Sequence, residues 1–156
     1  MRVNSLELNH FRSYHKFSIS FDHNINILIW KNAQGKTNLI ESIYLLSVCK
    51  SFRTHLNKQM ISFDQEFAKV KANITSNKKE RTLEVIIGDT FKKARLDQKD
   101  ILKISEFVGY LNVVVFVPDD LNLIKGSPNT RRKFLDLEIS KISPIYVFQL
   151  NRYYKL

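Results

Sequence analysis

The chain has one cysteine, four glycines, three prolines and fewer acidic than basic residues. Its single cysteine, Cys49, excludes an internal disulfide and a zinc site built from cysteines. The longest apolar run, Val113 to Val117, is far too short to span a bilayer. Residues 1–11 alternate and are partly polar, which is not the pattern of a secretory signal. We therefore expect a cytoplasmic protein with no membrane association.

The shortage of acidic side chains gives the chain a strong positive charge. Fifteen Asp and Glu stand against 25 Lys and Arg, which gives a net charge of +10 and a pI near 9.7. Such an excess suits a polyanionic partner, nucleic acid above all. The alternative is a basic soluble protein without such a partner, and composition does not choose between them. The length of 156 residues fits one domain with a real core.

A phosphate-binding loop without its first glycine lies between residues 26 and 38. The general pattern is G-x-x-x-x-G-K-[ST] between a strand and a helix. Trp30 stands where the first glycine belongs, whereas Gly35, Lys36 and Thr37 are present. In such a loop Lys36 reaches the β- and γ-phosphates, and the Thr37 hydroxyl ligates Mg²⁺. The sequence therefore predicts a site for a nucleoside triphosphate.

The tryptophan raises the question of whether this loop still binds a nucleotide. A bulky residue in a strained backbone conformation costs roughly 1–3 kcal/mol, and Lys31 adds a positive charge that partly offsets poorer geometry. The alternative is that residues 35–38 are a chance tetrapeptide at a helix start. The apolar segment Ile25 to Ile29, predicted to be a buried strand, and the helical periodicity after Lys36 argue against chance.

Apolar periodicity predicts the remaining elements. Strands are expected at residues 3–8, 17–21, 67–74, 82–87 and 91–96, with a central, fully buried strand at 112–117. A short helix is expected at 101–108, and Ser127-Pro128 and Ser143-Pro144 are typical helix starts. The apolar and aromatic residues of 144–156 predict a chain cut off inside a helical segment. The helix after the loop has a predicted inner stripe of Leu39, Ile40, Ile43, Tyr44, Leu46 and Ser47.

Several short stretches, taken in order, carry a family resemblance. They are Leu8-Asn-His-Phe-Arg-Ser-Tyr14, Asn26-Ile-Leu-Ile, Asn32-Ala-Gln-Gly-Lys-Thr-Asn38, Glu41-Ser-Ile-Tyr44, Lys50-Ser-Phe-Arg-Thr54, Leu111-Asn-Val-Val to Phe116, Pro118-Asp-Asp-Leu121, Lys125-Gly-Ser-Pro128, Arg131-Arg132 and Phe134-Leu-Asp136. With them the chain resembles the RecF family of bacterial DNA replication and repair proteins, relatives of the SMC and Rad50 head ATPases.

The resemblance implies an α/β fold: an ABC-ATPase-type P-loop lobe with a mixed sheet and an antiparallel β-subdomain. Residues 1–142 are then a partial ATPase head, and 143–156 the start of a truncated helical segment. No Leu-Ser-x-Gly-x pattern or terminal acidic strand precedes Leu156. This chain alone is therefore not expected to hydrolyse ATP efficiently.

The resemblance also implies ligands and partners. The cofactors are ATP and Mg²⁺, and the substrate is single-stranded, gapped or double-stranded DNA. Partners are RecO and RecR type mediator proteins and, in the full-length family, a second copy in an ATP-dependent homodimer. The expected setting is recombinational repair and the SOS response, in the bacterial cytoplasm at the nucleoid.

Site residues transfer by position. The nucleotide site comprises Arg12 and the loop Trp30, Lys31, Asn32, Ala33, Gln34, Gly35, Lys36, Thr37 and Asn38. Trp30 and Lys31 depart from the Gly-Glu of the family. Arg12 matches an arginine that reaches nucleotide phosphates in related heads, or it is an exposed turn arginine. Asp119 and Asp120 match a loop that contacts metal and water, or they form an acidic turn.

DNA contacts are predicted from basic residues on loops and helix starts, because such residues hold a phosphate backbone without reading its sequence. A solvated basic face is the alternative for each. The candidates are Lys50, Arg53, Lys125, Arg131, Arg132 and Lys133.

Three functions follow from these patterns. The first is an N-terminal fragment of a RecF-type repair ATPase whose ATP binding is impaired or lost through Trp30 and truncation. The second is a non-enzymatic DNA- or partner-binding module that has lost nucleotide binding. The third, a small P-loop kinase, is disfavoured because the family match leaves no room for an acceptor site or lid arginines.

Overall fold

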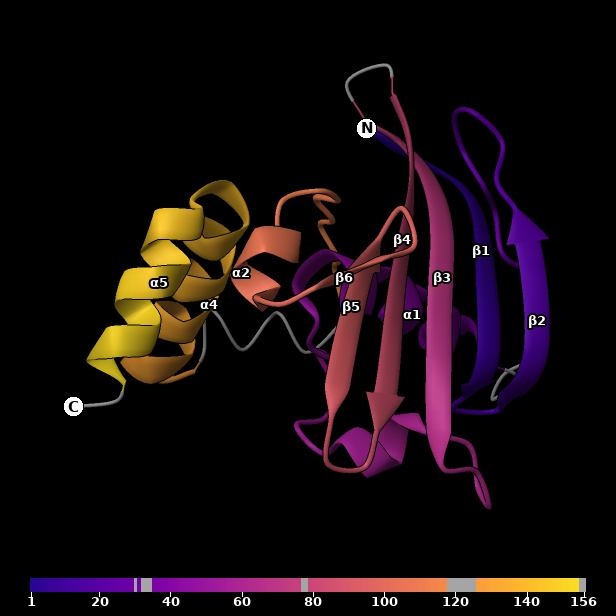
Figure 1. The fold of residues 1–156 in the computed structure, drawn as a ribbon, viewed down its shortest axis with the longest axis horizontal. Helices are drawn as coiled ribbons and strands as arrows, with labels where there is room; N and C mark the ends of the chain where they lie inside the picture. Colours follow the sequence, from indigo (N-terminus) through magenta and orange to yellow (C-terminus); the bar gives the residue numbers. More distant parts are fainter. Residues whose placement is uncertain (30, 32–34, 77–78, 118–125, 155–156) are drawn as a thin grey trace.

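The computed structural model describes residues 1–29, 31, 35–76, 79–117 and 126–154. Its centre is a six-stranded sheet of order β2-β1-β3-β4-β5-β6, in which every pair of neighbours is antiparallel (Figure 1). The strands are β1 (Arg2–Phe11), β2 (Tyr14–Ser20), β3 (Phe67–Ser76), β4 (Lys79–Gly88), β5 (Lys92–Leu96) and β6 (Lys99–Ile101).

The two faces of this sheet differ because side chains alternate along each strand. In β3, Ala68, Val70, Ala72 and Ile74 are buried. The residues between them face the other way, and there Lys69 pairs with Glu84 at 2.8 Å and Lys71 with Glu7 at 3.3 Å. One face therefore carries the core and the other a layer of ion pairs.

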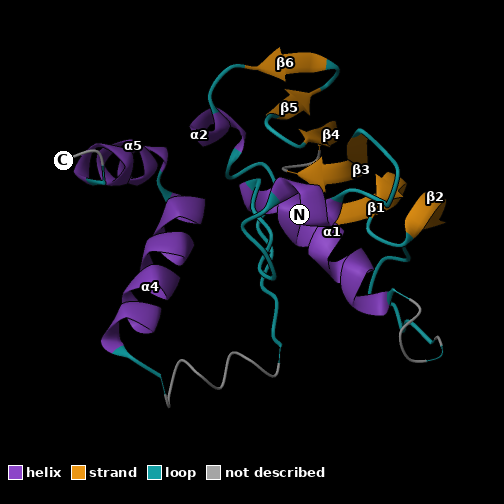
Figure 2. Ribbon diagram, turned by 90° about the horizontal axis from the view of Figure 1, so that it is seen from below, coloured by secondary structure: helices purple, strands orange, loops and turns teal. Residues whose placement is uncertain are grey.

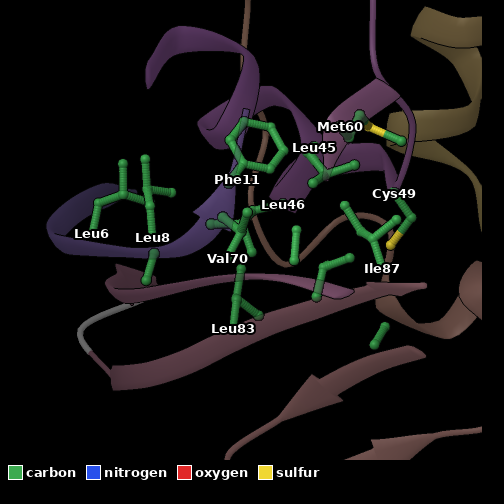
Figure 3. Close-up of a cluster of buried hydrophobic side chains, with 14 of the residues drawn as sticks. Leu6, Leu8, Phe11, Leu45, Leu46, Cys49, Met60, Val70, Leu83 and Ile87 are labelled. Atoms are coloured by element: carbon green, nitrogen blue, oxygen red, sulfur yellow. The ribbon is translucent and has the colours of Figure 1, made fainter. Parts of the chain in front are cut away.

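Helix α1 (Lys36–Val48) covers the apolar face (Figure 2). Its Leu39, Leu45 and Leu46 are fully buried. Figure 3 shows Leu45 and Leu46 in one cluster with Val70 and Leu83 of the sheet. Burying one such side chain stabilises the fold by about 1.5–3 kcal/mol. The short 3₁₀ helix η1 (Asn57–Met60) contributes Met60 to the same cluster.

Three further helices among the described residues lie toward the β6 side of the sheet (Figure 1). They are α2 (Ile104–Phe107), α4 (Pro128–Ile142) and α5 (Pro144–Tyr153). Both predicted helix starts are confirmed. The Ser143 side chain caps α5 by accepting from the Tyr146 amide at 3.2 Å, whereas the Ser127 side chain makes no cap hydrogen bond to α4.

The predicted α/β class and antiparallel subdomain are confirmed, and most elements lie where the periodicity places them. β1 continues to Phe11, so the predicted break at residues 10–14 narrows to the two residues between β1 and β2. On α1 the predicted stripe is wrong at Ile40, which is 40% exposed, while Leu45 and Glu41 are buried. β6 was not predicted, since three residues carry too little periodicity.

Two predicted strands are wrong. Residues 25–29 and 112–117 form no strand, and Ile25, Ile27, Ile29, Val114 and Phe116 are between 78% and 91% exposed. Their apolar, β-branched composition favours an extended chain, but a strand also needs a hydrogen-bonded neighbour. Within the described ranges neither segment belongs to a strand ladder. The parallel part of the predicted mixed sheet is therefore not formed there.

Candidate functional site

The start of α1 is built against the turn between β1 and β2. Gly35 precedes the helix with φ +96°, a conformation that side chains rarely adopt. A Cβ at this position would lie 2.9 Å from Tyr14 Oη and 3.2 Å from Ser13 Oγ. The Tyr14 hydroxyl also donates to the Gly35 carbonyl at 3.2 Å. Both the backbone angle and the close neighbour therefore require glycine here.

Arg12 occupies the same turn in a left-handed conformation, with φ 54°. Such a conformation costs a non-glycine residue free energy and persists where the surroundings hold it. Here the Arg12 amide donates to the Met60 carbonyl at 2.9 Å, and the Ser62 hydroxyl donates to the Arg12 carbonyl at 2.7 Å. The hydrogen bonds to the segment around η1 thus hold the Arg12 backbone in this conformation and set the direction of its side chain.

The Arg12 guanidinium points to Glu41 on the second turn of α1. Its Nε and Nη2 donate to the two carboxylate oxygens at 3.0 and 2.6 Å, and its Nη1 donates to the Gln59 carbonyl at 2.6 Å. The Glu41 side chain is fully buried, and that of Arg12 is 15% exposed. Arg12 is therefore no exposed turn arginine.

Two residues from the loop after α1 complete the contacts of this carboxylate. The Ser51 hydroxyl donates to Glu41 Oε1 at 2.5 Å, and Arg53 Nη1 donates to Glu41 Oε2 at 3.3 Å. Ser51 Oγ also accepts from the amides of Arg53 and Thr54 at 2.9 and 3.1 Å. We call Arg12, Glu41, Ser51 and Arg53 the Glu41 cluster.

Asn38, in the first turn of α1, links this cluster to the β1–β2 turn. Its Oδ1 accepts from Arg53 Nη1 at 2.7 Å, and its Nδ2 donates to Ser13 Oγ at 3.0 Å. Arg53 therefore bridges the first and second turns of the helix. The sequence prediction separated Arg12, a nucleotide candidate, from Arg53, a DNA candidate, and the structure brings both to one carboxylate.

The residues at this helix start fit a phosphate group and its magnesium. The first turn of α1 contains no acidic residue, so the helix dipole at this end favours an anion. Lys36 and Thr37 lie in that turn, and Thr37 is exposed. Lys36 would hold a phosphate and the Thr37 hydroxyl a Mg²⁺ ion. Lys31, described and exposed, lies on the loop before them.

Several predicted residues lie outside the described part of the chain. Nothing structural is therefore added to the predictions for the loop members Trp30, Asn32, Ala33 and Gln34, the acidic pair Asp119 and Asp120, or the basic candidate Lys125.

The other basic candidates are not gathered in one place. Lys50 is exposed directly after α1. Arg131, Arg132 and Lys133 are exposed on the first turns of α4, which both views place apart from the sheet and α1 (Figures 1 and 2). Arg131 Nη1 donates to the Gly126 carbonyl at 3.1 Å.

Sequence reasoning missed Glu41 and Ser51 as site residues. In the sequence Glu41 stands out only as part of a stretch that resembles the RecF family. A usable signal existed, because a carboxylate lies among the apolar residues of a buried helix and an arginine follows in the next loop. Charged residues are almost never fully buried unless they are paired.

Comparisons with known proteins place the chain among ATPases. The sequence profile of a family described as AAA ATPase domain matches residues 1–148. The DNA replication and repair protein RecF of Bacillus cereus (strain G9842) is 43% identical over the whole chain, and that of Bacillus thuringiensis (strain Al Hakam) is 42% identical. The predicted resemblance to RecF is thereby confirmed. The chain spans 42% of the length of each of these relatives.

Solved structures also resemble this chain. One of the recombination mediator protein RecF with ATP, in the RecFOR pathway, superposes with a TM-score of 0.91 at 32% identity, over 98% of this chain and 43% of that one. A chain from a study of ATP-driven dimerization and DNA-stimulated activation of SMC ATPases has a TM-score of 0.69 at 22% identity. That match covers 92% of this chain and 100% of the other, and it shows the fold alone.

Among the described residues no helix is long and apolar enough to cross a membrane.

Proposed function

This chain belongs to the AAA ATPase domain family, and from that premise we propose that it binds ATP with Mg²⁺ at the start of α1 in a RecF-like DNA repair protein. Lys36 contacts the β- and γ-phosphates, and Thr37 contacts the metal ion. Arg12 and Arg53 supply positive charge from the adjacent turn and loop. From their sequence positions we assign the loop members Trp30, Lys31, Asn32, Ala33 and Gln34 to the same nucleotide site.

One observation carries this proposal. Gly35 adopts a conformation that requires glycine, and it leads directly into a helix whose first turn holds Lys36 and Thr37 without any acidic residue. Chance occurrence of these four residues does not explain the left-handed Gly35 or the hydrogen bond from the Tyr14 hydroxyl to its carbonyl. A similar chain, RecF with ATP, has the same fold, which supports nucleotide as the ligand.

Binding to DNA is the second part of the proposal. The net charge of +10 favours a polyanion, and the basic start of α4 offers exposed guanidinium and ammonium groups. We assign single-stranded or gapped DNA as the partner, with RecO and RecR type proteins and a second copy of the chain as protein partners, in the bacterial cytoplasm at the nucleoid. The names of the RecF relatives support this setting.

Calorimetry with Mg-ATP tests the nucleotide site. The wild-type chain is expected to bind, and Lys36→Ala is expected to lose most of that affinity, because the side chain that reaches the phosphates is gone. Trp30→Gly restores the first glycine of the pattern and is expected to bind more tightly than wild type. Binding that is unchanged by Lys36→Ala would contradict the assignment of the site.

The tryptophan favours a second candidate, a DNA- or partner-binding module that no longer binds nucleotide. In that case ATP does not change the melting temperature of wild type, whereas a single-stranded oligonucleotide raises it. Trp30→Gly separates the two candidates, since recovery of ATP binding in this variant alone identifies the lost glycine as the defect.

A further inference from the structure

We propose that the buried carboxylate of Glu41 is a positioning group that holds Arg12 and Arg53 beside the start of α1, so that both guanidinium groups are oriented for a nucleotide phosphate before it arrives. The inference rests on the proposed function, because it assigns the phosphate as the anion. It adds a residue that contacts no phosphate itself.

The geometry of the Arg12–Glu41 pair is the first reason. Two parallel hydrogen bonds, at 3.0 and 2.6 Å, join the edge of the guanidinium to the carboxylate. This bidentate arrangement fixes the plane of the guanidinium as well as its position. A single charge contact would leave the group free to rotate, so this pair sets an orientation.

Burial is the second reason. The Glu41 side chain has no exposed surface, and a buried ion is tolerated only with good pairing and satisfied lone pairs. Its two oxygens accept from Arg12, Ser51 and Arg53. The carboxylate therefore cannot turn to water, and the arginines that it holds remain in place.

The charge balance is the third reason. Two guanidinium groups face one carboxylate, which leaves the cluster with one positive charge beside a helix start that lacks acidic residues. Arg53 uses its Nη1 for Glu41 and Asn38. Among the described residues its Nε and Nη2 make no hydrogen bond, and its side chain is 42% exposed. These groups are the donors that we assign to an incoming phosphate.

The test compares Glu41→Gln with Glu84→Gln. Glutamine keeps the shape but removes the charge, and it places an amide nitrogen against a guanidinium donor. Glu84 is a matched control, since it too is buried and paired with two cations, Lys69 at 2.8 Å and Arg95 at 3.1 Å, on the opposite face of the sheet. Mg-ATP affinity is measured by calorimetry, together with the melting temperature and the solvent exchange of the arginine Nε–H groups by NMR.

In Glu41→Gln the dissociation constant for Mg-ATP is expected to rise about tenfold, as for a lost charge-assisted contact, and the Arg12 Nε–H to exchange faster with water. In Glu84→Gln both are expected to stay within about twofold of wild type. Equal ATP affinity in Glu41→Gln and wild type would overturn the proposal. A fast-exchanging Arg12 Nε–H in wild type would overturn it as well.

Two further results keep the test decisive. If Glu41→Gln does not fold, Ser51→Ala takes its place, because it removes one donor to the carboxylate without changing the net charge. A smaller loss of ATP affinity is expected in this variant. An unchanged ATP affinity would overturn the proposal. If wild type does not bind ATP, the proposed function fails and the phosphate role fails with it. A protected Arg12 Nε–H that Glu41→Gln exposes would then still show that Glu41 orients the arginine.

Discussion

Helices α1 and α4 are similar in length and in the charge of their first turns, but they differ in how far they are buried. They have 13 and 15 residues, and neither has an acidic residue in its first turn. α1 starts with Lys36, and α4 carries Arg131, Arg132 and Lys133 after its first three residues. α1 buries eight of its residues. None of the α4 side chains that the structure describes is buried, and Phe134, Leu135, Ile139 and Ile142 are exposed.

The difference shows what burial does to the same residue types. On α1, burial obliges Glu41 to pair, and the pairing gives Arg12 and Arg53 defined positions. On α4, Arg132 and Lys133 stay in water, where an ion pair or a phosphate contact gains little from geometry and is screened by salt. This contrast supports the proposal that α1 holds one bound phosphate group and that α4 contacts a polyanion through exposed charges.

The largest expected contrast is in stability. Leu45→Ala on α1 removes a fully buried side chain from the core and is expected to lower the free energy of unfolding by about 2–5 kcal/mol. Leu135→Ala on α4, at a position 55% exposed, is expected to lower it by less than about 1 kcal/mol. Urea unfolding followed by circular dichroism measures both. Equal losses would mean that α4 is packed as tightly as α1 in solution.

The next contrast concerns the residues that precede the two helices. Gly35→Ala places a Cβ near Tyr14 at a positive φ and is expected to cost about 1–2 kcal/mol of unfolding free energy. Gly126→Ala is the matched control, because Gly126 is not among the described residues with positive φ. Its expected effect is within about 0.5 kcal/mol. Thermal unfolding of both variants checks the pair, and a neutral Gly35→Ala would contradict the requirement for glycine at the start of α1.

A third contrast uses DNA. Replacing Arg131, Arg132 and Lys133 together by Ala is expected to lower the slope of log affinity against log salt by about two units for single-stranded DNA. Fluorescence anisotropy of a labelled oligonucleotide over a series of KCl concentrations measures the slope. The control replaces three other exposed lysines, Lys16, Lys58 and Lys103. An equal change in both triple variants would leave α4 without a special role.

The smallest expected effect is at Cys49, which ends α1. Burial raises the pKa of its thiol to about 12 from an ordinary value of 9.0, against a smaller opposing influence of Lys92. Because the folded pKa is the higher one, its contribution to stability is complete below pH 9.0 and is lost as the pH rises toward 12. At pH 8 a thiol reagent is therefore expected to react only as fast as the protein unfolds. Fast reaction with the folded chain would show that this end of α1 opens.

Local patterns predicted much of this protein. The spacing of Gly35, Lys36 and Thr37 located the start of α1, and the Ser-Pro pairs located α4 and α5. Alternating apolar residues located β1, β2, β3 and β4. These features depend on residues a few positions apart, whose conformational preferences act within one turn or one strand.

Such local patterns do not predict contacts between residues that are far apart in the sequence. Arg12 and Glu41 are 29 positions apart, and Glu41 and Arg53 are 12 apart. The apolar surroundings of Glu41 in the sequence indicate that it needs a cation, but they do not specify Arg12 as the partner. For the same reason the segments 25–29 and 112–117 were predicted as strands, since their composition favours β structure but their pairing depends on distant neighbours.

The family, the α/β class, the place of the phosphate loop and the positive charge follow from the sequence alone, because each depends only on residue spacing or composition. Which basic residues are held in place and which stay in water depends on how the helices pack in three dimensions. Burying α1 on the sheet removes water from Glu41 and requires a cation beside it, whereas the exposed α4 has no such requirement.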